Sequence, residues 1–167
     1  MDLAWDVKRW SPEKANSYAR HWAVQTFGKE QGDDIGALLE KHYLLAAYGK
    51  PEHVFRLEYT VTELEQRLQD YHKLSADAEA IGKKLPERLQ DAYNHLVVYP
   101  INGCRYMNDY WLLYRRSMLN AAKGDEAAAR SDFEQSELAR KQLDMIDVSY
   151  NGAGAGKWNH IITWKNK

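Results

Sequence analysis

Residues 86–124 read PERLQDAYNHLVVYPINGCRYMNDYWLLYRRSMLNAAKG, and this stretch decides the fold class. Apolar and aromatic side chains recur in it at helical spacing for about eight turns. The seam that they form consists of Leu89, Tyr93, Leu96, Val97, Pro100, Cys104, Met107, Trp111, Tyr114 and Met118. Such a long repeat predicts one long helix that begins at Pro86 and ends at Gly124. Pro100 is expected to kink it, because proline lacks the backbone N–H group and clashes with the preceding turn.

Three helices are predicted before this stretch, two of them within the first fifty residues. The first begins at Ser11, a good N-cap residue, and ends at Gly28. The second begins at Asp33 or Asp34 and ends before Gly49. Apolar side chains at three- and four-residue spacing support both assignments.

Residues 53–60 are interpreted as an irregular link. Thr62 and Glu65 have the spacing of a capping box and predict a helix from about residue 63 to residue 85. A last helix is predicted from Asp125 to about Val148. Its buried side is expected to consist of Phe133, Leu138, Leu143 and Ile146.

These segments predict an all-α fold, a bundle of four to five mostly antiparallel helices in which one long helix is kinked at a proline. The links between the helices are short, so neighbours in sequence should pack antiparallel. The whole chain, residues 1–167, is expected to form a single helical domain. Residues 1–10 are assigned to an entry segment, and residues 149–167 to a glycine-rich turn and a tail.

Composition excludes several classes of function. The formal net charge is −1 and the isoelectric point is about 6.6, whereas nucleic-acid-binding domains usually have a basic face. No apolar run approaches the length that a membrane span requires, so neither a nucleic acid nor a membrane is an expected partner. The only cysteine, Cys104, cannot form an internal disulfide.

No motif for a metal or a cofactor is present, so neither is expected. A di-iron bundle requires Glu three residues before His, and none of the six histidines has it. The run GAGAGK at residues 152–157 differs from a phosphate-binding loop, because Asn151 stands where the first glycine belongs and Trp158 replaces the Ser or Thr.

Asp91 and Asp109 flank the long aromatic seam and are the less ordinary carboxylates of the sequence. A glycosidase needs two carboxyl groups across one cleft, and spacing alone does not place these two there. The favoured interpretation is that they are surface or helix-end charges. No catalytic residue is therefore predicted.

The order of several segments resembles the helical domain of the glycoside hydrolase family 115 α-glucuronidases. The most specific parts are the opening at residues 3–6, LAWD, and the close at residues 156–160, GKWNH. Between them the sequence contains YARHWA at residues 18–23 and VVYP at residues 97–100. The resemblance extends over nearly the whole chain, and it is lost over residues 161–167, which depart from the family's pattern.

The resemblance implies a large, secreted or periplasmic enzyme that removes (4-O-methyl)glucuronic acid from xylan. Its catalytic carboxylates would lie in a (β/α)8 barrel that precedes the helical domain, and a β-rich domain would follow. The chain then lacks the catalytic barrel, so it is expected to be inactive alone and to support and border the active site. The expected partners are the catalytic barrel and the β-rich domain, with xylan side groups bound through the whole enzyme.

Trp158, Asn159 and His160 are the candidates for a substrate rim, because an indole can stack on a sugar ring while an amide and an imidazole give directional hydrogen bonds. The alternative is that Trp158 packs back on the bundle as a plug. Tyr and Trp together number 17, an excess that fits side chains at the edges of the core or, as the alternative, an interdomain or homodimer contact. The other function considered is therefore a free-standing helical interaction module with an aromatic docking face.

Overall fold

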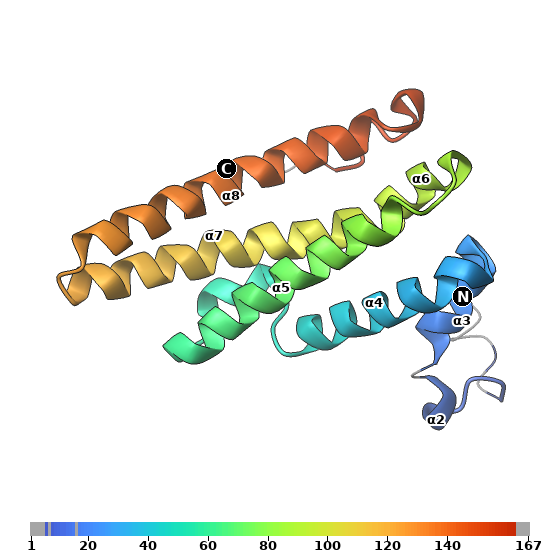
Figure 1. Ribbon diagram of the computed structural model, residues 1–167, viewed down its shortest axis with the longest axis horizontal. Coiled ribbons are helices and arrows are strands. Elements are labelled where there is room, and N and C mark those ends of the chain that lie inside the picture. Colours follow the sequence, from blue (N-terminus) through green and yellow to red (C-terminus); the bar gives the residue numbers. More distant parts are fainter. Residues whose placement is uncertain (1–5, 7, 16, 163–167) are drawn as a thin grey trace.

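The computed structural model describes residues 6, 8–15 and 17–162, and within them it is an all-α bundle, as predicted (Figure 1). The two long helices α7 (Tyr99–Ala122) and α8 (Glu126–Gly152) run antiparallel side by side. The helix α5 (Val61–Gly82) packs against α7, and α4 (Lys29–Ala47) packs against α5. Parts of the expected entry segment and tail, residues 1–5, 7 and 163–167, lie outside the described residues.

The predicted first helix is divided into α2 (Pro12–Ala15) and α3 (Tyr18–Phe27). The hydroxyl group of Ser17 donates a hydrogen bond to the Lys14 carbonyl at 2.8 Å, which closes α2 before α3 begins. The helix α3 ends at Gly28, as predicted.

The helix α4 begins at Lys29, earlier than the predicted Asp33 or Asp34, because Gly28 alone makes the turn between the two helices. Its φ of 92° is accessible to glycine and strained for other residues. Gly32 and Gly36 then allow α4 to lie directly against α3, since a Cβ atom at either position would collide with the backbone of Val24 or Arg20.

The link after α4 is more regular than predicted, because residues Pro51–Arg56 form a 3₁₀ helix. The capping box of α5 also lies two residues before the predicted pair. Thr60 accepts a hydrogen bond from the Glu63 amide, and the Glu63 carboxylate accepts one from the Thr60 amide. The pair Thr62 and Glu65 has the same spacing but begins two residues too late, inside the helix.

The predicted long helix consists of α6 (Glu87–Tyr93), a π-helical turn over Asn94–Val98, and α7. The Tyr99 amide donates to the Asn94 carbonyl, five residues back instead of four. This turn lies just before Pro100, so the break in α-helical hydrogen bonding comes before the proline that was expected to cause a kink.

The π-turn also changes which side of α7 is buried. It adds one residue to a turn, and each residue advances a helix by about 100°. Beyond the turn, three of the buried positions, Ile101, Asn108 and Leu112, lie one place later than a residue of the predicted seam. The other buried positions of α7 are Asn102, Asp109, Leu113 and Ser117. The predicted positions Tyr114 and Met118 are exposed.

The core consists of two clusters. The larger joins α3, α4, α5, α6 and the start of α7, and its largest fully buried side chains are Tyr71, Tyr93 and Ile35. The smaller lies between the 3₁₀ helix, α5 and α7 around Val54, Leu64 and Leu112. Neither cluster contains a residue of α8.

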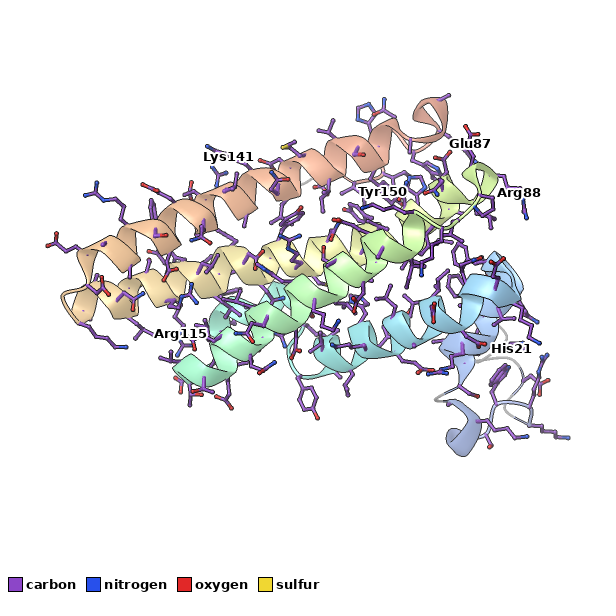
Figure 2. The ribbon with its side chains drawn as sticks, in the orientation of Figure 1. His21, Glu87, Arg88, Arg115, Lys141 and Tyr150 are labelled. Atoms are coloured by element: carbon purple, nitrogen blue, oxygen red, sulfur yellow. The ribbon has the colours of Figure 1, made fainter. Side chains whose placement is uncertain are left out.

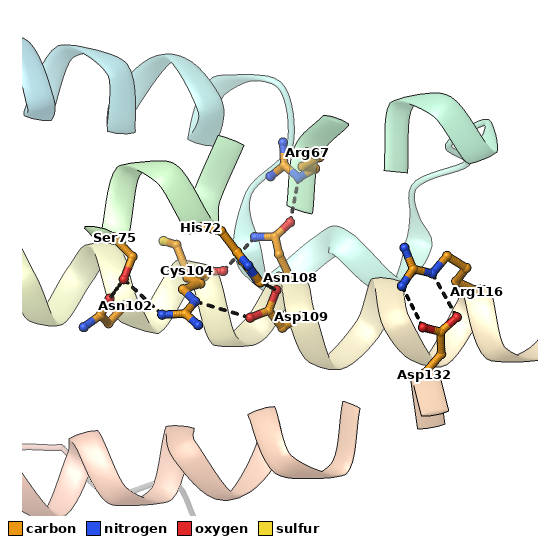
Figure 3. A network of polar contacts seen from close by, with 10 residues as sticks. Arg67, His72, Ser75, Asn102, Cys104, Asn108, Asp109, Arg116 and Asp132 are labelled. Atoms are coloured by element: carbon orange, nitrogen blue, oxygen red, sulfur yellow. Dashed lines mark hydrogen bonds and ion pairs between the residues drawn. The ribbon is translucent and has the colours of Figure 1, made fainter. Parts of the chain in front are cut away.

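The attachment of α8 is largely polar, and the predicted buried side is only partly right. Phe133 and Leu138 are exposed, and Leu143 and Ile146 are half-buried. The buried residues of α8 are Asp132, Ser136, Ala139 and Asp147. Figure 3 shows the main contact, in which Arg116 of α7 donates two hydrogen bonds to Asp132, at 2.6 and 2.9 Å. Buried polar groups with partners on the facing helix are invisible to a search for apolar periodicity.

A buried arginine joins the centre of the bundle. Arg67 of α5 is only 6% exposed, and within the described residues no carboxylate forms an ion pair with it. Its guanidinium donates hydrogen bonds to the Leu45 carbonyl at 3.1 Å, to the Gly49 carbonyl at 2.6 Å, and to Oδ1 of Asn108 at 2.6 Å. The side chain therefore connects the end of α4, α5 and α7.

We predict that Thr60→Ala lowers the free energy of unfolding by about 1 kcal/mol, because an N-cap acceptor is lost. The matched variant is Thr62→Ala, which removes the same hydroxyl group from an exposed position inside the helix. Urea denaturation followed by circular dichroism measures both. A larger loss from Thr62→Ala than from Thr60→Ala would contradict this assignment of the cap.

We also predict that Arg67→Met lowers the free energy of unfolding by about 3 kcal/mol, because three buried oxygen acceptors lose their donor. Arg88→Met is the control: Arg88 is exposed and labelled in Figure 2, and a change within about 0.5 kcal/mol is expected. Equal effects of the two variants in urea denaturation would show that the network around Arg67 does not stabilise the fold.

Candidate functional site

A hollow of about 460 Å³ lies where α6, the π-turn and the start of α7 face the end of α8. We call it the tyrosine hollow. Its rings are His95, Tyr99 and Tyr150. Its exposed polar side chains are Asp91, Asn94 and Ser149. This mixture of apolar surface and a few polar groups is typical of small-molecule sites.

The three rings form one continuous wall. The ring centroids of His95 and Tyr150 are 4.4 Å apart, and those of Tyr99 and Tyr150 are 4.5 Å apart. Tyr150 comes from α8 and the other two rings come from the π-turn and α7, so the wall closes the end of the helix pair. Figure 2 labels Tyr150 in this part of the molecule.

The π-turn positions His95 in this wall. The wider turn places His95 on the side that faces α8, in the same row as Asp91 one turn earlier and Tyr99 one turn later. Nε2 of His95 is buried and has no hydrogen-bond partner within the described residues. π-turns occur often at functional sites, and an unpaired buried nitrogen is costly for the fold.

Behind the wall, the hydroxyl group of Tyr99 donates a hydrogen bond of 2.7 Å to Oδ1 of Asp147. Burial raises the pKa of the Asp147 carboxyl above its ordinary value, and the nearby Asp144 adds to this, while the bond from Tyr99 opposes it. Burial, together with the adjacent Asp147, also raises the pKa of Tyr99. The hydrogen bond fixes the orientation of the Tyr99 ring.

The segment after α8 folds back on the helix end. The side-chain amide of Asn151 donates to the Ile162 carbonyl, and its oxygen accepts from the Ile162 amide at 3.0 Å. The loop between them contains two non-glycine residues in the left-handed region, Ala155 with φ of 57° and His160 with φ of 65°. The helix α8 ends at Gly152 and not at Val148 as predicted, so the glycine-rich turn begins after Gly152.

The structure brings only one of the three predicted rim residues against the tyrosine hollow. The edge of Trp158 packs on His95 with ring centroids 5.8 Å apart, and Nζ of Lys157 lies 4.8 Å from the Trp158 ring. Asn159 and His160 are exposed, and neither side chain forms a hydrogen bond within the described residues. Trp158 thus packs on the bundle while bordering the hollow.

Asp91 and Asp109 do not share a cleft. They are 18 residues apart on nearly continuous helix, which corresponds to about 27 Å along the axis, far beyond the separation of a glycosidase pair. Asp91 lines the tyrosine hollow, as expected of an exposed charge, whereas Asp109 is buried, contrary to the favoured interpretation.

Asp109 belongs to a polar network between α5 and α7, shown in Figure 3. Its Oδ1 lies 2.8 Å from Nε2 of His72, and its Oδ2 lies 3.4 Å from Nε of Arg105. A His–Asp pair orients a general base in hydrolases, but within the described residues His72 contacts no hydroxyl or thiol nucleophile through a hydrogen bond. The pair is therefore a structural contact.

Other chemistry is also absent from the part of the chain that the structure describes. Burial raises the pKa of the Cys104 thiol to about 11, so little thiolate is present at neutral pH. No group of three metal-ligating side chains occurs among the described residues. Over the same residues, no helix has the length and apolar character needed to span a bilayer.

Fold and site together define an all-α domain with an aromatic, polar hollow and no catalytic constellation in its described part. The family model described as "Glycosyl hydrolase family 115" matches residues 1–53. No curated protein matches the chain. One similar solved structure is described as a family GH115 4-O-methyl-alpha-glucuronidase, BtGH115A, with specificity for decorated arabinogalactans. The two chains are 27% identical and superpose with a TM-score of 0.85.

These matches confirm the resemblance: residues 1–53 match the family model, and the fold of the chain corresponds to a helical part of that solved family 115 enzyme. The superposition covers 98% of this chain and 22% of the solved chain, so the chain spans less than a quarter of that enzyme. The tyrosine hollow was not predicted. The signal in the sequence that could have predicted it is the four-residue spacing of Asp91, His95 and Tyr99. This spacing puts a carboxylate, an imidazole and a phenol on one side of a helix.

The Tyr99–Asp147 pair gives a pH-dependent prediction. Because the pKa of Asp147 is raised in the folded state, the folded chain binds the carboxyl proton more tightly than the unfolded chain does. Protonation of Asp147 therefore stabilises the fold at low pH, and this stabilisation is lost as the pH rises through the folded-state pKa. Asp147→Asn keeps an oxygen acceptor for Tyr99 and carries no charge.

The difference in unfolding free energy, Asp147→Asn minus wild type, should therefore increase between pH 3 and pH 7, a range that spans the ordinary pKa of about 3.9. Urea denaturation at several pH values measures it. Ser149→Ala, a neighbour that does not titrate, should show a constant difference. A difference for Asp147→Asn that does not change with pH would show that burial does not raise the pKa of Asp147.

Proposed function

We propose that this chain is the helical domain of an enzyme similar to the α-glucuronidases that remove (4-O-methyl)glucuronic acid from xylan, where it supports the catalytic part and borders the active site. The observation that supports this proposal is the superposition of 98% of the chain on part of a 4-O-methyl-alpha-glucuronidase. In this proposal the carboxylates that cleave the glycosidic bond are supplied by another part of the enzyme.

Exposed apolar side chains support contacts with the other domains. Leu138, Met145 and Val148 form a stripe on the outer side of α8, at seven- and three-residue spacing. A second group, Leu44 and Tyr48, lies at the end of α4, where Tyr48 is 74% exposed. Apolar patches of this kind mark surfaces that are covered by a partner. We assign that role to the catalytic barrel and the β-rich domain, and a homodimer contact is the competing use of the same surface.

Trp158, Asn159 and His160 are proposed as part of the substrate rim. Trp158 borders the tyrosine hollow, and the two polar side chains beside it are exposed and free to bind hydroxyl groups. Since Lys157 is exposed, its ammonium can leave the Trp158 face when a sugar ring stacks there.

We predict that Trp158→Ala in the complete enzyme lowers kcat/KM on decorated xylan about fivefold, the effect of losing one stacking contact. Phe133→Ala is the control, because it removes another exposed aromatic ring away from the tail. Initial rates and a thermal melt are measured for both variants. Unchanged turnover with a lower melting temperature would make Trp158 a plug of the bundle and would exclude its role in the rim.

The coding sequence on either side of this chain tests the proposed function itself. An in-frame stretch of barrel size before Met1 supports a domain of a glycoside hydrolase. A stop codon and a ribosome-binding site directly before Met1 would overturn it and favour the free-standing interaction module. In that case, the exposed groups on α4 and α8 become the docking face.

A further inference from the structure

We infer that the tyrosine hollow is a binding site for a neutral, hydroxyl-rich sugar unit, next to the rim at Trp158–His160. The inference depends on the proposed function only for the kind of glycan, since the binding itself is argued from the hollow. Its volume of about 460 Å³ falls in the range of small-molecule sites, which is roughly 300–1,000 Å³.

The apolar part of the hollow has the form that a sugar requires. Tyr99 and Tyr150 are tilted by 49° relative to each other, and His95 and Tyr150 by 43°, so the rings make an angled wall and not a flat stack. A pyranose presents C–H groups on its faces and hydroxyl groups around its edge. Aromatic walls bind the C–H faces, and the hydroxyl groups then need polar partners nearby.

The polar part of the hollow supplies those partners. The side chains of Asp91, Asn94 and Ser149 form no hydrogen bond to protein within the described residues. Deeper in the hollow, Oδ1 of Asn102 accepts from Ser75, and its amide group has no protein acceptor there. A purely apolar ligand would desolvate these groups without compensation, which disfavours it.

Charge excludes an anionic ligand. Among the described residues, no lysine or arginine lines the hollow, and Asp91 is the one acidic side chain in its lining. Asp147 lies directly behind Tyr99, which adds a second carboxyl near the same wall. A phosphate or a uronate would thus meet carboxylates without a cationic partner. The site therefore fits the neutral part of a glycan, and not the glucuronic acid side group itself.

The loop after α8 fits a site that opens for its ligand. Trp158 packs on His95, whose Nε2 is buried and without a partner, so the ligand-free arrangement leaves one polar atom unsatisfied. The same loop contains Ala155 and His160 in the left-handed region, a strain that is common in segments that clamp ligands. Movement of Trp158 would let a sugar hydroxyl group reach Nε2.

The test is an NMR titration of the isotope-labelled 167-residue chain with three probes: xylotriose, β-1,3-galactobiose and glucuronic acid. One neutral probe should shift the amides of Asp91, Asn94 and Ser149 in a saturable way, and which one does so distinguishes a xylan from a galactan backbone. Glucuronic acid should not shift them. Tyr150→Ala should weaken binding of the neutral probe about tenfold.

Phe55→Ala is the matched control, because Phe55 lines a different groove together with Trp111 and should leave binding unchanged. If Tyr150→Ala does not fold, Ser149→Phe puts a bulky ring at an exposed position on the edge of the hollow and should block the same shifts.

Three outcomes would overturn the inference: no saturable shift with either neutral probe, equal binding of glucuronic acid, or wild-type binding by a folded Tyr150→Ala. None of them bears on the coding sequence around the chain, so the site and the proposed function fail separately. Binding by a chain that is not joined to a barrel would make it a sugar-binding module.

Discussion

The bundle depends on one buried cation, the guanidinium of Arg67. Burying a charge is costly, and here, within the described residues, no carboxylate offsets the cost. Instead, the guanidinium donates hydrogen bonds to two backbone carbonyls at the end of α4 and to Asn108. Its carbon also lies 5.6 Å from the ring centroid of Tyr59 and 5.1 Å from that of Tyr71. The carbonyls at a helix C-terminus carry partial negative charge, so the arginine also complements the α4 dipole. This contact fixes the order of α4, α5 and α7, and both apolar clusters lie next to it.

The second constraint is the π-turn before Pro100. It widens one turn of the long helix directly before the proline at which a kink was predicted. The consequence reaches the candidate site. His95 lies within this turn and Tyr99 directly follows it, and both rings pack on Tyr150. The same local irregularity thus sets the packing of α7 and shapes the tyrosine hollow.

Polar contacts decide how α8 is held and what surface it leaves free. Arg116 and Asn120 bind Asp132 at one end, and Tyr99 binds Asp147 at the other. Hydrogen-bonded contacts of this kind fix the register of two helices, while the apolar side chains of α8 remain available on its outer side. This arrangement suits a domain within a larger enzyme, because the free apolar stripe can pack against another domain while the hollow stays at the helix end.

The sequence by itself determined the helical fold class, the sites where glycine ends a helix, and the resemblance to family 115, because periodicity, capping chemistry and short segments are local properties of the chain. It did not determine the cap at Thr60, since two overlapping Thr–x–x–Glu pairs fit the same pattern. It also placed Phe133 and Leu138 inside, where Asp132 and Ser136 lie. Only the tertiary structure decided these points, because the partners of a buried polar group come from another helix. The tyrosine hollow depends most on the tertiary structure, because its wall joins His95 and Tyr99 to Tyr150, which lies about fifty residues further along the chain.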